Sequence, residues 1–187
     1  MGQTANFKTD VEIYPNDFLR QVNLALPPDI AVSSLEEVSP RFHARLNAVS
    51  KTYRYTIWNS EISHVFLTPF CFQVKEPLDI AQMKKAALLF EGEHDFKAFC
   101  SNKHMKKSTI RTIEEIRFEI DGSKIDLYYC GNGFLYHMVR IMTGTLIEIG
   151  EGKRTIASIA ELFQTLNRID AGFTAPPQGL TLMEVKY

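Results

Sequence analysis

Apolar and polar residues alternate with the two-residue period of a β-strand over several stretches of the chain. The clearest stretch is 48–59, AVSKTYRYTIWN, where bulky aromatic and β-branched side chains strengthen the pattern. Asp121-Gly122 separates two further stretches and predicts a hairpin turn between them. The strands predicted after residue 47 are 48–59, a short one within 61–71, 109–120, 124–130 and 180–186.

Other segments repeat apolar residues every three or four positions, which is the spacing of a helix that packs one face on a core. Asp79 is placed to cap the second of these helices. The turn Gly131-Asn132-Gly133 precedes the third, because glycine and asparagine tolerate the positive φ of a tight turn. The predicted helices are 15–26, 80–90, 134–149 and 155–166.

This order of elements predicts an α+β fold with a mainly antiparallel sheet and helices packed on one face. The first forty residues read as strand, helix and strand, with strands over 5–9 and 30–38. A unit this small cannot enclose a core of its own. We therefore expect residues 1–40 to be the remnant of an N-terminal α+β domain, with an exposed strand edge that favours dimers. Residues 41–187 form a C-terminal α+β domain.

Composition limits the kind of partner that the chain can have. Its 187 residues carry 21 basic and 22 acidic side chains, so any site for a polyanion has to be a local patch. Cys71, Cys100 and Cys130 form no C-x-x-C pair, which argues against a disulfide scaffold or a zinc ribbon and favours the reducing cytoplasm. No apolar run approaches the roughly 20 residues that span a bilayer, and no signal peptide is visible, so no membrane partner is expected.

Two basic clusters stand out in this neutral chain. Although solvated charge is the usual explanation for a lysine, Phe42, His43 and Tyr53 lie among these cations, which favours a surface that follows phosphates and stacks on bases. Tyr53 and Tyr55 share one strand face, and either core packing or base stacking explains them. The cations of the clusters are Arg41, Arg45, Lys51 and Arg54, and then Lys103, Lys106 and Lys107.

Cys100 lies between His94 and His104, which suggests a thiol nucleophile or a metal site. No third group stands at a recognisable spacing, so a structural cysteine is the commoner explanation. His137 is either a packing residue or a contact to substrate.

Arg140 is the one cation inside the apolar segment FLYHMVRIMTGTLIEI. A guanidinium is always charged and is costly to bury alone, so Arg140 is expected to face a carboxylate or a phosphate. Asp95 and Asp126 are the nearest candidates in the chain. The first resembles a cap and the second alternates with core residues of a strand, so neither has a suitable context.

Five segments together are similar to one family. They are RFHARLNAVSKTYRYTIWN, HDFKAFCS, STIRTI, GNGFLYHMVRIMTGTLIEIGEGKR and RIDAGFTAPPQGLTLMEV, and they resemble the tRNA pseudouridine synthase A family in order and spacing across the chain. The resemblance implies an isomerase that converts uridine to pseudouridine in the tRNA anticodon stem-loop, without a metal or organic cofactor. It also implies two α+β domains meeting at a basic cleft, usually in a homodimer.

The resemblance also implies roles for individual residues. Tyr53 corresponds to the tyrosine that stacks on the target base, Arg140 to the arginine that pairs with the catalytic aspartate, and Leu180 to the apolar wall of the uracil pocket. The domain 41–187 would thus carry catalytic and RNA-binding residues. The expected RNA contacts are Arg41, His43, Arg45, Lys51, Arg54, Lys103, Lys106, Lys107, Arg111 and His137.

One part of the family pattern is missing. The catalytic aspartate of the family lies in G-R-T-D-[AS]-G-V-H, just before the segment that here reads GQTANFKT, and the sequence contains no G-R-T-D. We therefore expect this chain to lack the nucleophilic aspartate and to be inactive alone, whether through a cut or a natural absence. The alternative is a non-catalytic RNA-binding module.

Overall fold

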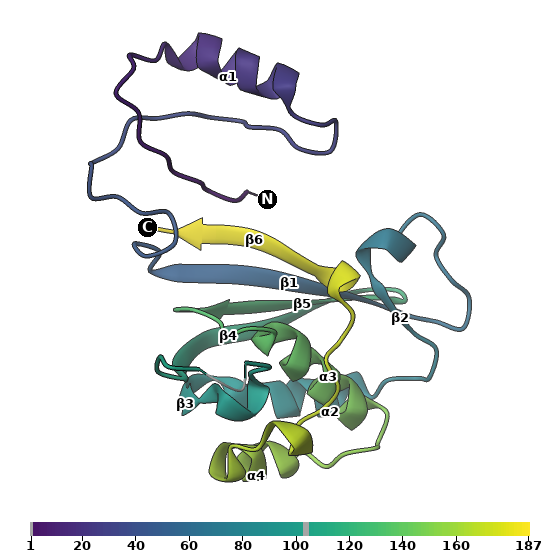
Figure 1. Cartoon of the computed structure of the whole chain (residues 1–187). Coiled ribbons are helices and arrows are strands. Elements are labelled where there is room, and N and C mark those ends of the chain that lie inside the picture. The colour runs from purple at the N-terminus through teal and green to yellow at the C-terminus, as the bar shows by residue number, and fades with distance from the viewer. Residues whose placement is uncertain (1, 103–104) are drawn as a thin grey trace. The chain divides into compact units, whose positions relative to one another are not determined.

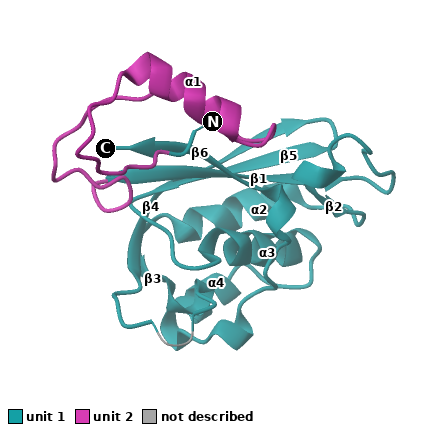
Figure 2. Ribbon diagram, turned by 45° about the horizontal axis from the view of Figure 1, so that its top comes forward, with its two compact units in different colours: residues 1–3, 48–187 teal, residues 4–47 magenta. Residues whose placement is uncertain are grey.

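The computed structural model describes residues 2–102 and 105–187, and it divides the chain into two compact units (Figure 2). The smaller unit is Thr4–Asn47, and the larger unit is Ala48–Tyr187 with Met1–Gln3. The sheet lies entirely in the larger unit.

The smaller unit is built around helix α1 (Pro15–Ala25), which starts with a proline, as the sequence predicts. The rings of Phe7 and Phe18 stack with their centroids 5.5 Å apart. The side chain of Asn23 bonds both the N–H and the carbonyl of Val32, at 2.8 and 2.9 Å.

The strands predicted over 5–9 and 30–38 are wrong, because neither segment belongs to a sheet. A segment becomes a strand only when its backbone pairs with a neighbour, and alternation in the sequence does not reveal whether a neighbour exists. The exposed edge expected from the strand over 5–9 is therefore absent as well.

The larger unit contains a six-stranded sheet, drawn from blue β1 to yellow β6 in Figure 1. Along the sheet the order is β2-β1-β5-β4-β3, and β6 pairs with the same edge of β1 as β2 does, nearer the start of β1. Only the pairing of β1 with β2 is parallel, so the mainly antiparallel prediction is confirmed. The strands are β1 (Ser50–Asn59), β2 (Phe72–Val74), β3 (Gly92–Asp95), β4 (Ile110–Asp121), β5 (Lys124–Gly131) and β6 (Leu180–Lys186).

Helices cover one face of this sheet, as predicted (Figure 1). Helix α2 (Ile80–Ala87) is capped by the Asp79 side chain, which accepts a hydrogen bond from the Gln82 N–H over 3.0 Å. Helix α3 (Met138–Gly150) is buried along most of its length, and α4 (Ser158–Thr165) follows it. None of the helices in the described part of the chain is long and apolar enough to cross a membrane.

The connection from β5 to α3 differs from the prediction in two ways. The helix begins at Met138 instead of residue 134, and Gly131 does not take a positive φ. Gly131 is required for another reason: a Cβ there would lie 2.6 Å from the carbonyl oxygen of Thr112. The left-handed conformation instead falls on His137, whose φ is 64°.

Candidate active site

The first turn of α3 carries Arg140 between two buried residues, Val139 and Ile141. Its Nε donates a hydrogen bond of 2.6 Å to the carbonyl of Ala175, a fully buried residue. The N–H of Ala175 donates in return to the Arg140 carbonyl over 3.1 Å. The guanidinium is thus held through Nε, and its two Nη groups form no hydrogen bond or ion pair with the described residues 2–102 and 105–187.

Arg140 has no ion pair with any residue of 2–102 or 105–187. The two aspartates considered from sequence are used elsewhere. Asp95 accepts from the Lys97 N–H over 3.0 Å and so caps a short helix. Asp126 accepts from the Thr56 hydroxyl over 2.6 Å and pairs with Lys124 over 2.7 Å.

Strand β1 places the two candidate tyrosines at different depths. Tyr55 is fully buried, and its hydroxyl donates to the carbonyl of Pro176 over 2.6 Å. Burial raises the pKa of the Tyr55 phenol above its ordinary value, and the nearby charge of Arg140 opposes part of that rise. Tyr53 is only half-buried, and its ring meets Phe134 edge to face with centroids 5.2 Å apart. Tyr55 is therefore a core residue, and Tyr53 keeps surface that a ligand can reach.

Leu180 lies directly opposite Tyr55 in the pairing of β1 with β6, so the two side chains point to the same face of the sheet. Leu180 is half-buried against the core. Gly179 precedes it, and a Cβ there would lie 2.8 Å from the Tyr55 ring. This close approach fixes the start of β6 against Tyr55, and so fixes Leu180.

The segment between α4 and β6 holds the carbonyl that Arg140 binds. Arg168 donates to the Gly172 carbonyl over 3.0 Å and to the Thr174 hydroxyl over 2.9 Å. From α3, Glu148 accepts from the Phe173 N–H over 3.1 Å. Burial lowers the pKa of Arg168, and the charge of Glu148 opposes this. Arg168 and Glu148 are functional residues that were not predicted from the sequence. The cation in the short segment between α4 and the two prolines was a usable signal for Arg168.

His137 immediately precedes α3, and its Nδ1 lies 3.2 Å from the hydroxyl oxygen of Ser101. Burial lowers the pKa of His137, and the charges of Arg140 and Arg168 lower it further. A pKa below its ordinary value keeps the imidazole mainly neutral at neutral pH.

The other predicted RNA contacts are spread over both units. Arg54 points away from Tyr53 and Tyr55, and its Nε lies 3.8 Å from the carboxylate of Asp126. Arg111 lies beside Gly133 at the start of β4, and its Nη1 donates to the Ser108 carbonyl over 3.0 Å. Of the remaining residues, Arg41, His43 and Arg45 are exposed in the smaller unit, Lys51 is half-exposed on β1, Lys106 and Lys107 are exposed before β4, and Lys103 lies outside the described residues.

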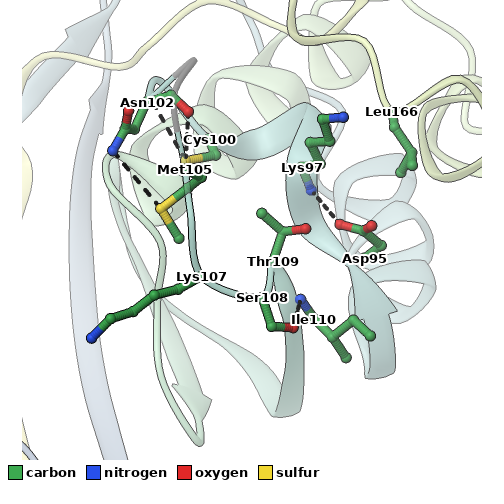
Figure 3. A pocket seen from close by; sticks show the side chains of 10 residues that line it. All are labelled: Asp95, Lys97, Cys100, Asn102, Met105, Lys107, Ser108, Thr109, Ile110 and Leu166. Carbon is green, nitrogen blue, oxygen red and sulfur yellow. Dashed lines mark hydrogen bonds between the residues drawn. The ribbon is translucent and has the colours of Figure 1, made fainter.

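A hollow of about 380 Å³ lies between Cys100 and Leu166 (Figure 3). The Sγ of Cys100 accepts from the Asn102 N–H over 3.4 Å, and Cys100 is buried. His94 stacks on Phe163 with centroids 4.4 Å apart. His104 lies outside the described residues, and the described ones contain no cluster of three metal-binding side chains. The geometry around Cys100 is that of a packed structural cysteine.

Comparison with known proteins identifies the family. Residues 86–187 match the family model for tRNA pseudouridine synthase. The tRNA pseudouridine synthase A of Geobacillus sp. (strain WCH70) is 41% identical over 186 residues, which is 100% of this chain and 75% of that protein. The chain belongs to the tRNA pseudouridine synthase family.

Two further relatives carry the same family name. The tRNA pseudouridine synthase A 2 of Clostridium perfringens (strain 13 / Type A) is 42% identical over 183 residues, covering 98% of this chain and 75% of that protein. The tRNA pseudouridine synthase A of Bacillus sp. (strain KSM-64) is 40% identical over 187 residues, covering 100% and 76%. The resemblance inferred from the five sequence segments is confirmed, and the chain spans about 75% of the length of these synthases.

Proposed function

We propose that Tyr53, Arg140 and Leu180 form the uridine-binding and aspartate-orienting part of a pseudouridine synthase site that acts on tRNA. The proposal depends on one observation, which is that Arg140 is fixed in place but lacks a carboxylate partner among the described residues. Its Nε is fixed by the Ala175 carbonyl over 2.6 Å, and no carboxylate of the described residues pairs with it. Such a guanidinium is prepared to bind a carboxylate through its two Nη groups.

The chemistry of the reaction suits these groups. A uridine in the anticodon stem-loop has to leave its stack before its glycosidic bond can break, and the half-buried Tyr53 ring offers a surface on which the extruded base stacks. Arg140 keeps the catalytic carboxylate ionised and oriented. That carboxylate either attacks the nucleotide or abstracts a proton.

The isomerisation needs no oxidant or reductant, because substrate and product contain the same atoms and electrons. The bond from N1 to C1′ breaks, the uracil turns, and a bond from C5 to C1′ forms. The proton on C5 is lost and N1 gains one. Leu180 provides an apolar wall against which the detached base turns. An apolar side chain suits this role, because it forms no hydrogen bond that would hold the base in one orientation.

The test is release of tritium from tRNA labelled at C5 of uridine. The 187-residue chain, which contains no G-R-T-D sequence, is expected to release none. A fusion that adds an N-terminal segment with the G-R-T-D sequence expected of the family is expected to release tritium. In this fusion, Arg140→Ala abolishes release, and Arg140→Lys retains little, because lysine lacks the planar pair of donors. Release by the unfused chain, or an active Arg140→Ala fusion, would contradict the proposal.

We propose that tRNA is held largely through its phosphates by the exposed cations of both units, and that the enzyme works in the cytoplasm. The affinity of the chain for unmodified tRNA should then fall as a power of salt concentration. Lys106→Gln with Lys107→Gln should make that dependence shallower. Lys84→Gln with Lys85→Gln, on α2, is the matched control and should leave it unchanged.

We also propose that the chain forms a homodimer. The loop before β2 is supported by a hydrogen bond of 2.7 Å from the Trp58 indole to the Ile62 carbonyl, yet its apolar side chains face solvent. These side chains are Ile62, Val65, Phe66 and Phe70. Several large apolar side chains exposed on one short loop favour an interaction surface. Light scattering of the wild-type chain is expected to give the mass of a dimer. The Phe66→Glu variant is expected to be a monomer, and its circular dichroism spectrum should match that of wild type, because its fold is unchanged. A wild-type monomer at high concentration would contradict this.

A further inference from the structure

The residue before His137 presents an aromatic ring to solvent from a fixed backbone. Tyr136 is 61% exposed, whereas its neighbours Leu135 and Met138 are buried. The carbonyl of Tyr136 accepts a hydrogen bond of 3.1 Å from the Ser101 N–H. The carbonyl of Leu135 accepts one of 3.1 Å from the Met138 N–H. The backbone is therefore anchored around Tyr136, and its exposed ring is held at a defined position.

One face of this ring is covered by His137. The two rings stack with centroids 3.8 Å apart and planes 26° apart. His137 takes a left-handed φ of 64°, a backbone conformation that is strained for a residue with a side chain. Its imidazole is tied to Ser101 over 3.2 Å. Strain of this kind persists where the surroundings fix it, and it is concentrated at binding sites.

The charge around the stacked pair suits a polyanion. Arg140 lies three residues after His137, in the first turn of α3. Burial lowers the pKa of the His137 imidazole, and the charges of Arg140 and Arg168 lower it further, so both guanidinium groups act electrostatically on this ring. Neither guanidinium has an ion pair with a described residue. A protein surface that binds unpaired nucleotides combines such cations with an exposed aromatic ring.

We propose that Tyr136, backed by His137, is a platform on which a nucleobase next to the extruded uridine stacks. The proposal rests on the proposed function, because it places a second base beside the site of Tyr53. Phe134, which contacts Tyr53, and Tyr136 are two residues apart, so their Cα atoms are at most about 7 Å apart. Tyr53 and Tyr136 can therefore contact neighbouring nucleotides of one RNA strand.

The test measures binding of the 187-residue chain to an unmodified anticodon stem-loop RNA with 2-aminopurine beside the target uridine. Tyr136→Ala is expected to weaken binding about 5-fold to 150-fold, which corresponds to the loss of one base–aromatic stack. It is also expected to remove the quenching of 2-aminopurine fluorescence. Tyr136→Phe and Tyr136→Trp should bind within about twofold of wild type, because each keeps a stacking ring.

Two controls separate stacking from other causes. Tyr14→Ala removes a ring that is 67% exposed in the smaller unit and should leave affinity unchanged. The slope of log affinity against log salt should be the same in Tyr136→Ala as in wild type, because no phosphate contact is lost. Melting temperatures of all variants should agree, since the ring is exposed.

The outcomes distinguish this proposal from the one on which it rests. If the wild-type chain binds the RNA and Tyr136→Ala binds it equally well, the platform is disproved while the proposed function stands. If Tyr136→Phe is as weak as Tyr136→Ala, a hydrogen bond of the hydroxyl, and not stacking, holds the base. If the wild-type chain binds no RNA, both proposals fail.

Discussion

The Nε of Arg140 and the carbonyl of Ala175 are joined by a hydrogen bond of 2.6 Å, and a second bond of 3.1 Å runs from Ala175 back to the Arg140 carbonyl. The position of the guanidinium therefore depends on the segment that carries Ala175. That segment is itself held by side chains of α3 and by Arg168. The side chains that hold this segment thus set the geometry of Arg140.

Glu148 is expected to be one of these positioning residues. One carboxylate oxygen accepts from the Phe173 N–H over 3.1 Å, and the other lies 2.9 Å from the Nε of Arg154. Glu148→Ala should lower the free energy of unfolding by about 1–3 kcal/mol, because it leaves both donors unpaired. It should also reduce tritium release by the fused enzyme. Urea unfolding and the tritium assay measure the two effects.

Glu148→Gln separates the two contacts, since it can still accept from Phe173 but no longer carries a charge for Arg154. It should lose less stability and retain more activity than Glu148→Ala. Equal loss of activity in Glu148→Gln and Glu148→Ala would mean that the charge, and not the hold on Phe173, matters for the site.

Gly144 is expected to be indispensable for the contact between α3 and the same segment. A Cβ at this position would collide with the carbonyl oxygen of Phe173. Alanine normally favours a helix over glycine by about 1 kcal/mol. Gly144→Ala should nevertheless destabilise the protein by roughly 1–3 kcal/mol, the usual result of forcing atoms into a packed site. Thermal unfolding measures this.

Gly133→Ala is the matched control, because its Cβ would lie no nearer than 3.6 Å to any atom and its φ is not positive. It should leave the melting temperature almost unchanged. A stabilised Gly144→Ala variant would show that Phe173 can move away from α3 without cost and that the segment around it is not fixed.

Strong local signals explain which parts of the fold could be predicted. Strand β1 and the hairpin of β4 and β5 were predicted because alternation, aromatic residues and Asp121-Gly122 agree at each position. Strand β3 reads GEHD, which is short, polar and without alternation, so the sequence predicted a loop there. It is a strand because β4 offers it a partner, and partners are not encoded locally.

The same limit applies to the site. Arg140 was identified because a single cation inside an apolar run is conspicuous. Tyr53 and Tyr55 could not be separated, since alternation gives the face of a strand but not the depth of each side chain beneath the helices. Arg168 and Glu148 were missed because their partners are mainly backbone groups, and no residue type marks a carbonyl or an N–H that needs a partner.

Asp126 is expected to stabilise the face of the sheet that the helices leave uncovered. Its carboxylate binds the Thr56 hydroxyl at 2.6 Å and Lys124 at 2.7 Å, and it lies 3.8 Å from Arg54. Asp126→Ala should lower the free energy of unfolding by about 1–3 kcal/mol, because the buried Nε of Arg54 then loses the carboxylate that lies 3.8 Å from it. Lys124→Met is the control and should cost less, since Lys124 is partly exposed. Equal stability of wild type and Asp126→Ala would show that this ion-pair group is replaceable by water.

His137 is expected to make stability depend on pH on the acid side of neutrality. Its pKa in the folded chain lies below the ordinary value of about 6.5, so the unfolded chain binds a proton first as the pH falls. The contribution of His137 to the free energy of unfolding is fully present above about pH 6.5 and is lost progressively as the pH falls below that value. His137→Asn should remove this contribution, because asparagine does not titrate and tolerates the left-handed φ. Urea unfolding of both proteins at several pH values between about 7 and 5 measures the difference. Parallel pH profiles for the two proteins would mean that the imidazole is not held neutral beside Arg140 and Arg168.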